Sequence, residues 1–228
     1  MDRPLALMAP ILLGMAVLIW LAGCVGGVDR GSAAATELAT VTDSPAKDVD
    51  AARAPGQEMQ MPDYPTGCEV IALQNALDGF GLNLNFDEVY GLFDKSDDDF
   101  VTAWWGSPYG SGGAVYPPGM AAAANRALAG SGHVALDATG ATLEGIADCL
   151  GRRGLALVWI TTDMQPPRFT AWTIGKWRMY SNEHCSIAYD IHDGHLFLQD
   201  PLHGDVSVPV GEFQAIWEAC GSMMVTIY

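Results

Sequence analysis

A β-hairpin pattern in the last third of the chain sets the strongest limit on its fold. The segment EHCSIAYD, residues 183–190, has the composition of a β-strand, and HLFLQDP, residues 195–201, reads as a returning strand. Between them stands IHDG, in which Asp193 and Gly194 favour a tight turn between antiparallel strands. The C-terminal part of the chain is therefore expected to form an antiparallel sheet.

Helical patterns dominate the chain before this hairpin. In residues 66–81, apolar side chains recur on one helical face. Thr66 is a suitable N-cap and Glu69 stands three residues later, so the two are expected to form a capping box. Further helices are predicted over residues 86–93, after Pro118, and over residues 142–151.

Three more apolar segments read as strands, namely LALVWITT from Leu155, DVSVPV from Asp205 and MMVTIY from Met223. Two other segments are expected to be loops. DKSDDDF, from Asp94, does not have the spacing of a calcium-binding loop. WWGSPYGSGGAVYPPGM, from Trp104, is rich in glycine, proline and aromatic residues, and either walls a binding site or packs on the surface. Helices followed by antiparallel strands indicate an α+β fold.

The N-terminal segment MDRPLALMAPILLGMAVLIWLAGC has the apolar run of a secretory signal. Its end, Leu21-Ala22-Gly23-Cys24, resembles a bacterial lipobox, which implies a lipoprotein signal peptide over residues 1–24 and a lipid on Cys24. The alternative is an uncleaved transmembrane helix. Both interpretations place the rest of the chain on the extracytoplasmic side of a cell membrane, tethered to it.

Residues 25–58 are mostly small or polar, so they cannot bury enough surface to offset the entropy of ordering them. They are expected to be a flexible tether, which leaves residues 59–228 as one folded domain. The formal net charge of the chain is -16. This charge argues against nucleic acid as a partner and against electrostatic attachment to anionic lipid.

Four cysteines remain in the expected domain: Cys68, Cys149, Cys185 and Cys220. Disulfides can form outside the cytoplasm, and Cys149 with Cys220 is one option, although sequence alone does not set the connectivity. A disulfide at Cys68 would prevent that residue from acting as a nucleophile. No C-x-x-C or H-x-x-x-H spacing indicates a metal site, and no cofactor is predicted.

Cys68 is expected in the first turn of a helix, where free N–H groups and the helix dipole favour the thiolate. The alternative is a cysteine that merely packs in the core. His184 begins one strand of the predicted hairpin and Asp200 ends the other, sixteen residues later. The hairpin should bring them together, as needed for a carboxylate that orients a general base. A slip of one residue in register would place them on opposite faces.

Three segments in order resemble the bacteriocin-processing, double-glycine-leader peptidase-like family of papain-like cysteine peptidases. They are PTGCEVIALQNALDGFG, YGSGGAVYPPGMAAAANRAL and HCSIAYDIHDGHLFLQDPLHG. The resemblance implies a papain-like fold over residues 60–228, with Cys68 as nucleophile, His184 as base and Asp200 as the group that orients the imidazole. Gln60 would donate to the oxyanion, and Gln57 is a less suitable substitute because it lies further into the tether.

These observations together predict a membrane-anchored, extracytoplasmic thiol hydrolase that cleaves peptide or related amide bonds through an acyl-enzyme. Its partners would be a peptide or protein substrate and, through the lipid anchor, a membrane. A peptidoglycan amidase on the same fold is one alternative. A catalytically inactive lipoprotein that binds a partner is the other.

Overall fold

The computed structural model describes residues 54–228. The predicted signal peptide, Cys24 and the tether up to residue 53 lie outside these described residues. Within residues 54–228, none of the helices combines the length and the apolar content that crossing a membrane requires.

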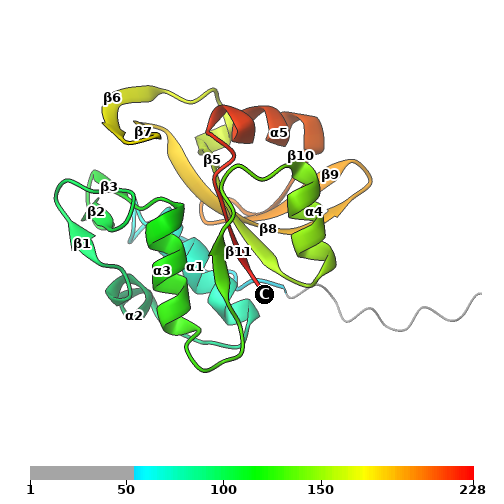
Figure 1. Cartoon of the computed structure of the whole chain (residues 1–228), viewed down its shortest axis with the longest axis horizontal. Helices are drawn as coiled ribbons and strands as arrows, with labels where there is room; N and C mark the ends of the chain where they lie inside the picture. Colours follow the sequence, from blue (N-terminus) through cyan, green and yellow to red (C-terminus); the bar gives the residue numbers. More distant parts are fainter. Residues whose placement is uncertain (1–53) are drawn as a thin grey trace, which may run out of the picture. The chain divides into compact units, whose positions relative to one another are not determined.

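A six-stranded antiparallel sheet with the strand order β10-β9-β8-β5-β11-β4 forms the centre of the domain (Figure 1). Its strands are β4 (Ala135–Asp137), β5 (Leu155–Thr161), β8 (Glu183–His192), β9 (His195–Asp200), β10 (Gly204–Pro209) and β11 (Met224–Ile227). The described helices are α1 (Cys68–Gly79), α2 (Phe86–Gly91), α3 (Pro117–Ala127), α4 (Leu143–Gly151) and α5 (Val210–Ala219).

Both faces of the central strand β5 are covered, and every residue of it is buried. Leu157 and Trp159 belong to a core that includes α1 and α3, whereas Val158 and Ile160 belong to a second core that includes α4 and α5. A strand buried on both faces has no polar side to show, which explains the continuous apolar run from Leu155. The prediction of a buried strand here is confirmed.

The start of α1 depends on a glycine. A Cβ atom at Gly67 would lie 2.9 Å from Cβ of Tyr64 and 3.2 Å from the ring of Phe86. The rings of Tyr64 and Phe86 are stacked, with centroids 3.5 Å apart. Gly67 is therefore needed for close packing between the segment before α1 and the start of α2.

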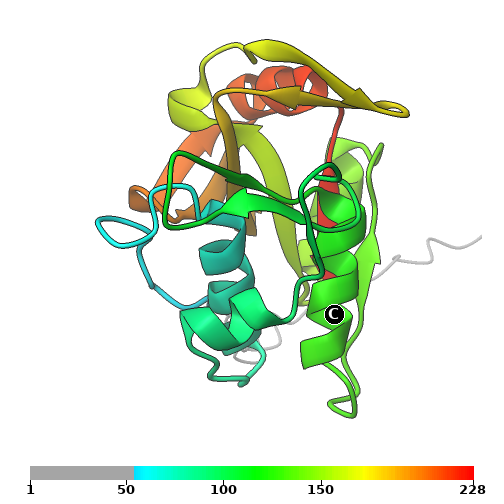
Figure 2. The ribbon, with the colours of Figure 1, turned by 90° about the vertical axis from the view of Figure 1, so that its left-hand side faces the viewer.

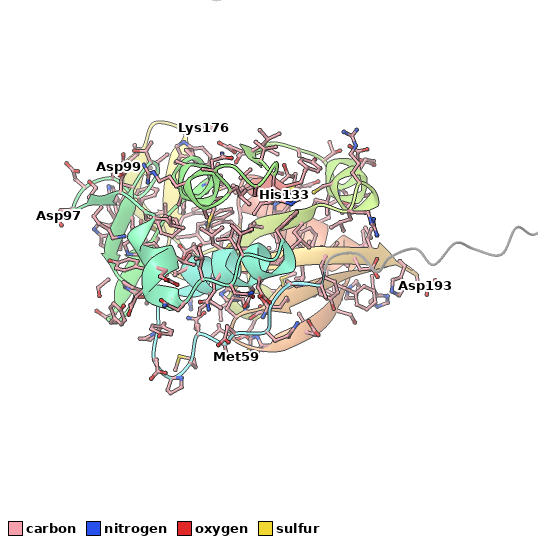
Figure 3. All side chains as sticks on the ribbon, turned by 90° about the horizontal axis from the view of Figure 1, so that it is seen from below. Met59, Asp97, Asp99, His133, Lys176 and Asp193 are labelled. Carbon is pink, nitrogen blue, oxygen red and sulfur yellow. The ribbon has the colours of Figure 1, made fainter. Side chains whose placement is uncertain are left out.

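The hairpin of β8 and β9 has the predicted two-residue turn, with Asp193 at φ 50° and Gly194 at φ 75°. Two successive left-handed residues are the requirement of the type I′ turn, and Asp-Gly meets it at low cost. Asp193 lies at the outer tip of this hairpin (Figure 3).

Strand β8 contains one more residue than its partner beyond this turn. Asp190 pairs with Phe197 but Ala188 pairs with Leu198, so Tyr189 is a β-bulge. The register after the bulge places Asp200 opposite Ser186, on the face that also carries His184.

In the part of the chain that the structure describes, two smaller sheets lie outside the central sheet (Figure 2). One contains β1 (Lys95–Ser96), β2 (Trp104–Ser107) and β3 (Gly112–Ala114), and the other contains β6 (Phe169–Ile174) and β7 (Trp177–Tyr180). The expected aromatic loop therefore includes the β2–β3 hairpin, which sequence reasoning missed. It also missed β4, α5 and the β6–β7 hairpin.

The folded region begins earlier than residue 59. Gly56 N–H donates to Asn75 O at 2.8 Å, and Glu58 N–H donates to Asn75 Oδ1 at 2.9 Å. Asn75 is a buried residue of α1. Residues 54–58, predicted as the end of the tether, therefore pack against the domain because α1 satisfies their backbone groups.

Candidate active site

Cys68 is the first residue of α1, as predicted, but the helix start differs from the expected capping box. Gly67 is the N-cap, and no side chain caps the helix. The Thr66 hydroxyl instead donates to Ser107 O at 2.8 Å, which ties the start of α1 to the end of β2. The capping-box prediction was wrong because both of its members bond to other segments.

Glu69 is directed into the protein and is fully buried. Its Oε1 accepts the Val115 N–H at 3.0 Å, and its Oε2 accepts the Cys68 S–H at 3.1 Å. Sequence reasoning assigned Glu69 to a capping box with Thr66 and so missed its contact with the candidate nucleophile. The partner at Val115 is 46 residues away, so no local pattern could reveal it.

A second acidic side chain, from Glu183 at the start of β8, lies beside this pair. One ligating atom from each of Cys68, Glu69 and Glu183 lies within 4.8 Å of the other two. A sulfur and two carboxylate oxygens at this spacing could hold a metal ion. The carboxyl groups of Glu69 and Glu183 also interact through a side-chain hydrogen bond, which requires one of them to be protonated. Sequence reasoning missed Glu183, whose position next to His184 was the available signal.

The predicted contact between His184 and Asp200 is confirmed. His184 Nε2 lies 2.9 Å from Asp200 Oδ2, and both side chains are buried. The Ser186 hydroxyl donates to the same oxygen at 3.1 Å, and the Leu202 N–H donates to Oδ1 at 2.7 Å. These three partners fix the carboxylate, which in turn fixes the orientation of the imidazole ring.

The environment of Asp200 favours its charged form. Burial alone would raise the pKa of this carboxyl group, but the hydrogen bond and the charge of His184 lower it, together with the donors at Leu202 and Ser186. The net pKa is about 2. Asp200 is therefore ionised at every pH at which the protein is expected to work.

The environment of Cys68 does not favour the thiolate in this state. Burial raises the pKa of the thiol well above its ordinary value, and the nearby Glu69 and Glu183 raise it further. The sequence predicted the opposite, from the helix dipole. Desolvation and two acidic neighbours outweigh a dipole contribution of about 0.3–1 kcal/mol.

The two acidic neighbours are themselves shifted. Burial raises the pKa of Glu69, and its hydrogen bonds with Val115 and Cys68 lower it only in part, so the net pKa is about 7. Burial and the neighbouring Glu69 raise the pKa of Glu183 well above its ordinary value. Both shifts favour the protonated carboxyl groups, because burial and mutual repulsion oppose a second negative charge beside Cys68.

Gln60 lies in the same cleft as Cys68 and His184, and the cleft has a volume of about 520 Å³. Its side-chain Nε2 donates to Pro65 O at 3.1 Å, and its backbone N–H donates to Pro201 O at 2.9 Å. The amide has a second N–H that is available for an oxyanion. Gln57 is exposed, and its side chain donates to Asp205 instead.

The four cysteines of residues 54–228 are free and buried. Cys149 and Cys220 are not bonded to each other, because they belong to the two cores on opposite sides of the sheet. Cys68 is therefore not blocked by a disulfide.

No family model and no curated protein matches this chain. Among solved structures, a presumed C39-like peptidase from Bacillus anthracis superposes with a TM-score of 0.68 at 22% sequence identity, over 78% of this chain and 95% of that chain. A double glycine motif protease from an AMS/PCAT transporter, in complex with its leader peptide, superposes with a TM-score of 0.45 at 14% identity, over 78% of this chain and 93% of that chain. The first similarity confirms the predicted papain-like α+β fold.

Proposed function

We propose that this protein is a thiol hydrolase that cleaves peptide or related amide bonds through an acyl-enzyme. The observation that carries this proposal is the arrangement of Cys68, Gln60 and His184 around one cleft, with Asp200 bonded to the imidazole. A nucleophile, a base with its orienting carboxylate and an oxyanion donor are the parts that acyl transfer needs.

In the proposed reaction, the Cys68 thiol turns from Glu69 toward His184, whose imidazole takes its proton. The thiolate attacks the substrate carbonyl carbon, and the resulting oxyanion accepts hydrogen bonds from the Cys68 N–H and the Gln60 amide. The C–N bond then breaks, and the amine leaves with the proton from the imidazolium. Water, deprotonated by His184, hydrolyses the thioester and releases the acid and the thiol.

We further propose that a lipid on Cys24 holds this domain at the extracytoplasmic face of a membrane. The lipobox-like sequence that ends at Cys24 supports this location. The substrate would then be a peptide or protein outside the cytoplasm.

A peptide-based acyl trap, such as an acyloxymethyl ketone, tests the hydrolase function when the modified residue is located by mass spectrometry. We expect labelling of Cys68 in the wild type and its loss in His184→Ala. The matched control is Cys185→Ala, which removes a buried thiol next to His184 and should leave Cys68 labelling intact. Failure of the wild type to react at Cys68, with the protein folded, would instead favour an inactive binding domain.

A further inference from the structure

The β6–β7 hairpin differs in charge from the rest of this acidic chain. Arg168, Lys176 and Arg178 are three of the 11 lysines and arginines in the sequence. The segment from Met164 to Asn182 contains no aspartate or glutamate. The hairpin therefore presents positive charge on a protein whose formal net charge is -16.

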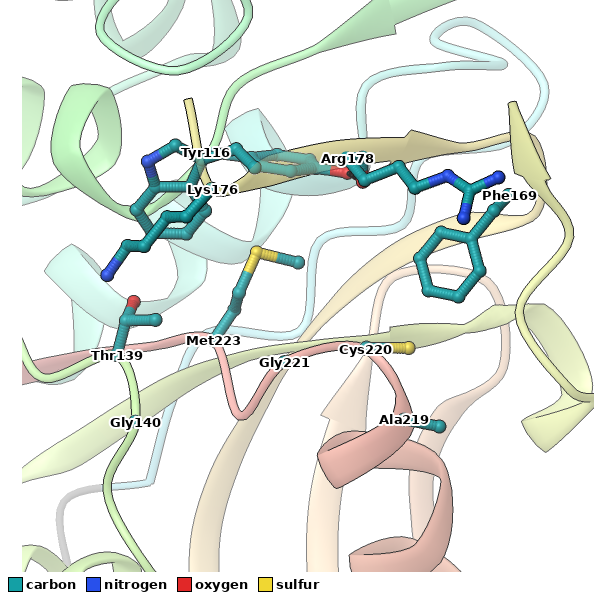
Figure 4. A pocket seen from close by; sticks show the side chains of 11 residues that line it. Tyr116, Thr139, Gly140, Phe169, Lys176, Arg178, Ala219, Cys220, Gly221 and Met223 are labelled. Atoms are coloured by element: carbon teal, nitrogen blue, oxygen red, sulfur yellow. Dashed lines mark hydrogen bonds between the residues drawn. The ribbon is translucent and has the colours of Figure 1, made fainter. Parts of the chain in front are cut away.

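A pocket of about 290 Å³ lies against this hairpin, next to the end of α5 (Figure 4). Lys176 and Arg178 extend toward opposite ends of the pocket, and Met223 lies between them. Phe169, which is 40% exposed, closes one end. Among residues 54–228, those that line the pocket include these two cations and no acidic residue, so the pocket combines an apolar interior with a positive rim.

Neither cation is neutralised by a carboxylate in the described part of the chain. The Arg178 guanidinium lies over the Phe169 ring at 4.8 Å, and its Nε donates to Thr170 O at 3.0 Å. The Lys176 ammonium lies 4.7 Å from the Trp177 ring centroid. These contacts hold both side chains at the rim while leaving their charges available to an external anion.

The same hairpin also borders the cleft that contains Cys68. Thr170, Met179 and Tyr180 line that cleft, whereas their neighbours Phe169 and Arg178 line the second pocket. A chain bound in the cleft and continuing across the hairpin would therefore reach the positive rim.

We propose that this pocket binds an acidic segment of the peptide substrate, with an apolar side chain inside and carboxylates paired with Lys176 and Arg178. The proposal rests on the hydrolase function proposed above, because it places the pocket on the path of a chain held in the Cys68 cleft. The charge complementarity is selective, since the acidic surface elsewhere repels such a segment.

The test measures binding of two fluorescent peptides to the full chain carrying Cys68→Ala, which cannot cleave them. One peptide has a leucine flanked by aspartates, and the other has asparagines in their place. We expect the acidic peptide to bind more tightly than the asparagine peptide. Combining Lys176→Gln and Arg178→Gln should lower the affinity for the acidic peptide about five- to tenfold, because two exposed charge pairs of ordinary strength are lost. Binding of the asparagine peptide should not change.

Three controls make the result specific. Arg152→Gln removes an exposed cation that pairs with Asp148 on α4, and should not affect either peptide. Arg178→Lys keeps the charge and should therefore retain much of the affinity for the acidic peptide that Arg178→Gln loses. Circular dichroism of each variant shows whether the fold is intact.

Equal binding of the two peptides by the Cys68→Ala protein would overturn the proposal. So would an equal loss for both peptides in the double variant, which would indicate a structural effect. Binding to vesicles that contain anionic lipid is measured in parallel. If the double variant loses vesicle binding but keeps its preference for the acidic peptide, the hairpin faces a membrane and the proposal is wrong. Acyl-trap labelling of Cys68 is independent of these arms, so the hydrolase function and the acidic specificity can fail separately.

Discussion

Replacing Glu69 by glutamine should make the free energy of unfolding depend less on pH. Burial raises the pKa of Glu69 from 4.5 to about 7, a shift that corresponds to about 3 kcal/mol at 1.36 kcal/mol per unit. Because the folded pKa is the higher one, this contribution is fully present below pH 4.5 and is lost as the pH rises through about 7. Glutamine does not titrate and can still accept the Val115 N–H.

Urea unfolding followed by tryptophan fluorescence, at about pH 5 and about pH 8, measures this difference directly. We expect the wild type to lose more stability than Glu69→Gln between these two conditions, by up to about 3 kcal/mol. Glu212→Gln is a matched control, because Glu212 is an exposed residue of α5. If the wild type and Glu69→Gln show the same pH dependence, burial does not raise the pKa of Glu69 in the folded protein and this reasoning is wrong.

Three other outcomes are expected. At about pH 8, Glu69→Gln should speed the alkylation of Cys68 by iodoacetamide several-fold, because an ionised carboxylate no longer opposes the thiolate; unchanged kinetics by mass spectrometry would contradict this. Asp200→Asn should remove about 2 kcal/mol from the free energy of unfolding above pH 3.8. The wild type loses this contribution as the pH falls through about 2, so the stabilities of the two proteins in acid unfolding curves should converge there. Cys24→Ala should abolish incorporation of a fatty-acid analogue, and continued labelling would exclude Cys24 as the lipid site.

Local patterns predicted those parts of the fold that depend on neighbours along the chain. A few consecutive residues are enough to predict the apolar run of β5, the Asp193-Gly194 turn and the start of α1 near Cys68. The segment of α5 also carried a signal that was missed, since Phe213 and Trp217 stand four residues apart and both are buried.

The environment of the candidate nucleophile could not be read in the same way. Glu69 fits a capping box by spacing, but its partner Val115 and its neighbour Glu183 are distant in sequence. Whether a carboxyl group caps a helix or enters the core depends on which segment packs against it. The sequence therefore predicted the residues of the cleft better than the protonation state of Cys68.

The bulge at Tyr189 implies a parity rule for changes in the length of the β8–β9 hairpin. Without the extra residue, the register set by Asp190 and Phe197 would place Asp200 opposite Ile187, on the face away from His184. A single insertion or deletion between His184 and Asp200 therefore places the two side chains on opposite faces of the sheet, unless a second one restores the register. A change of two residues in one strand keeps the face but moves the carboxylate by about 6.8 Å along the sheet. In natural variants and designed hairpins that keep the contact between His184 and Asp200, an insertion or deletion should therefore be accompanied by a second one that restores the register. This holds whatever the sequence of the turn.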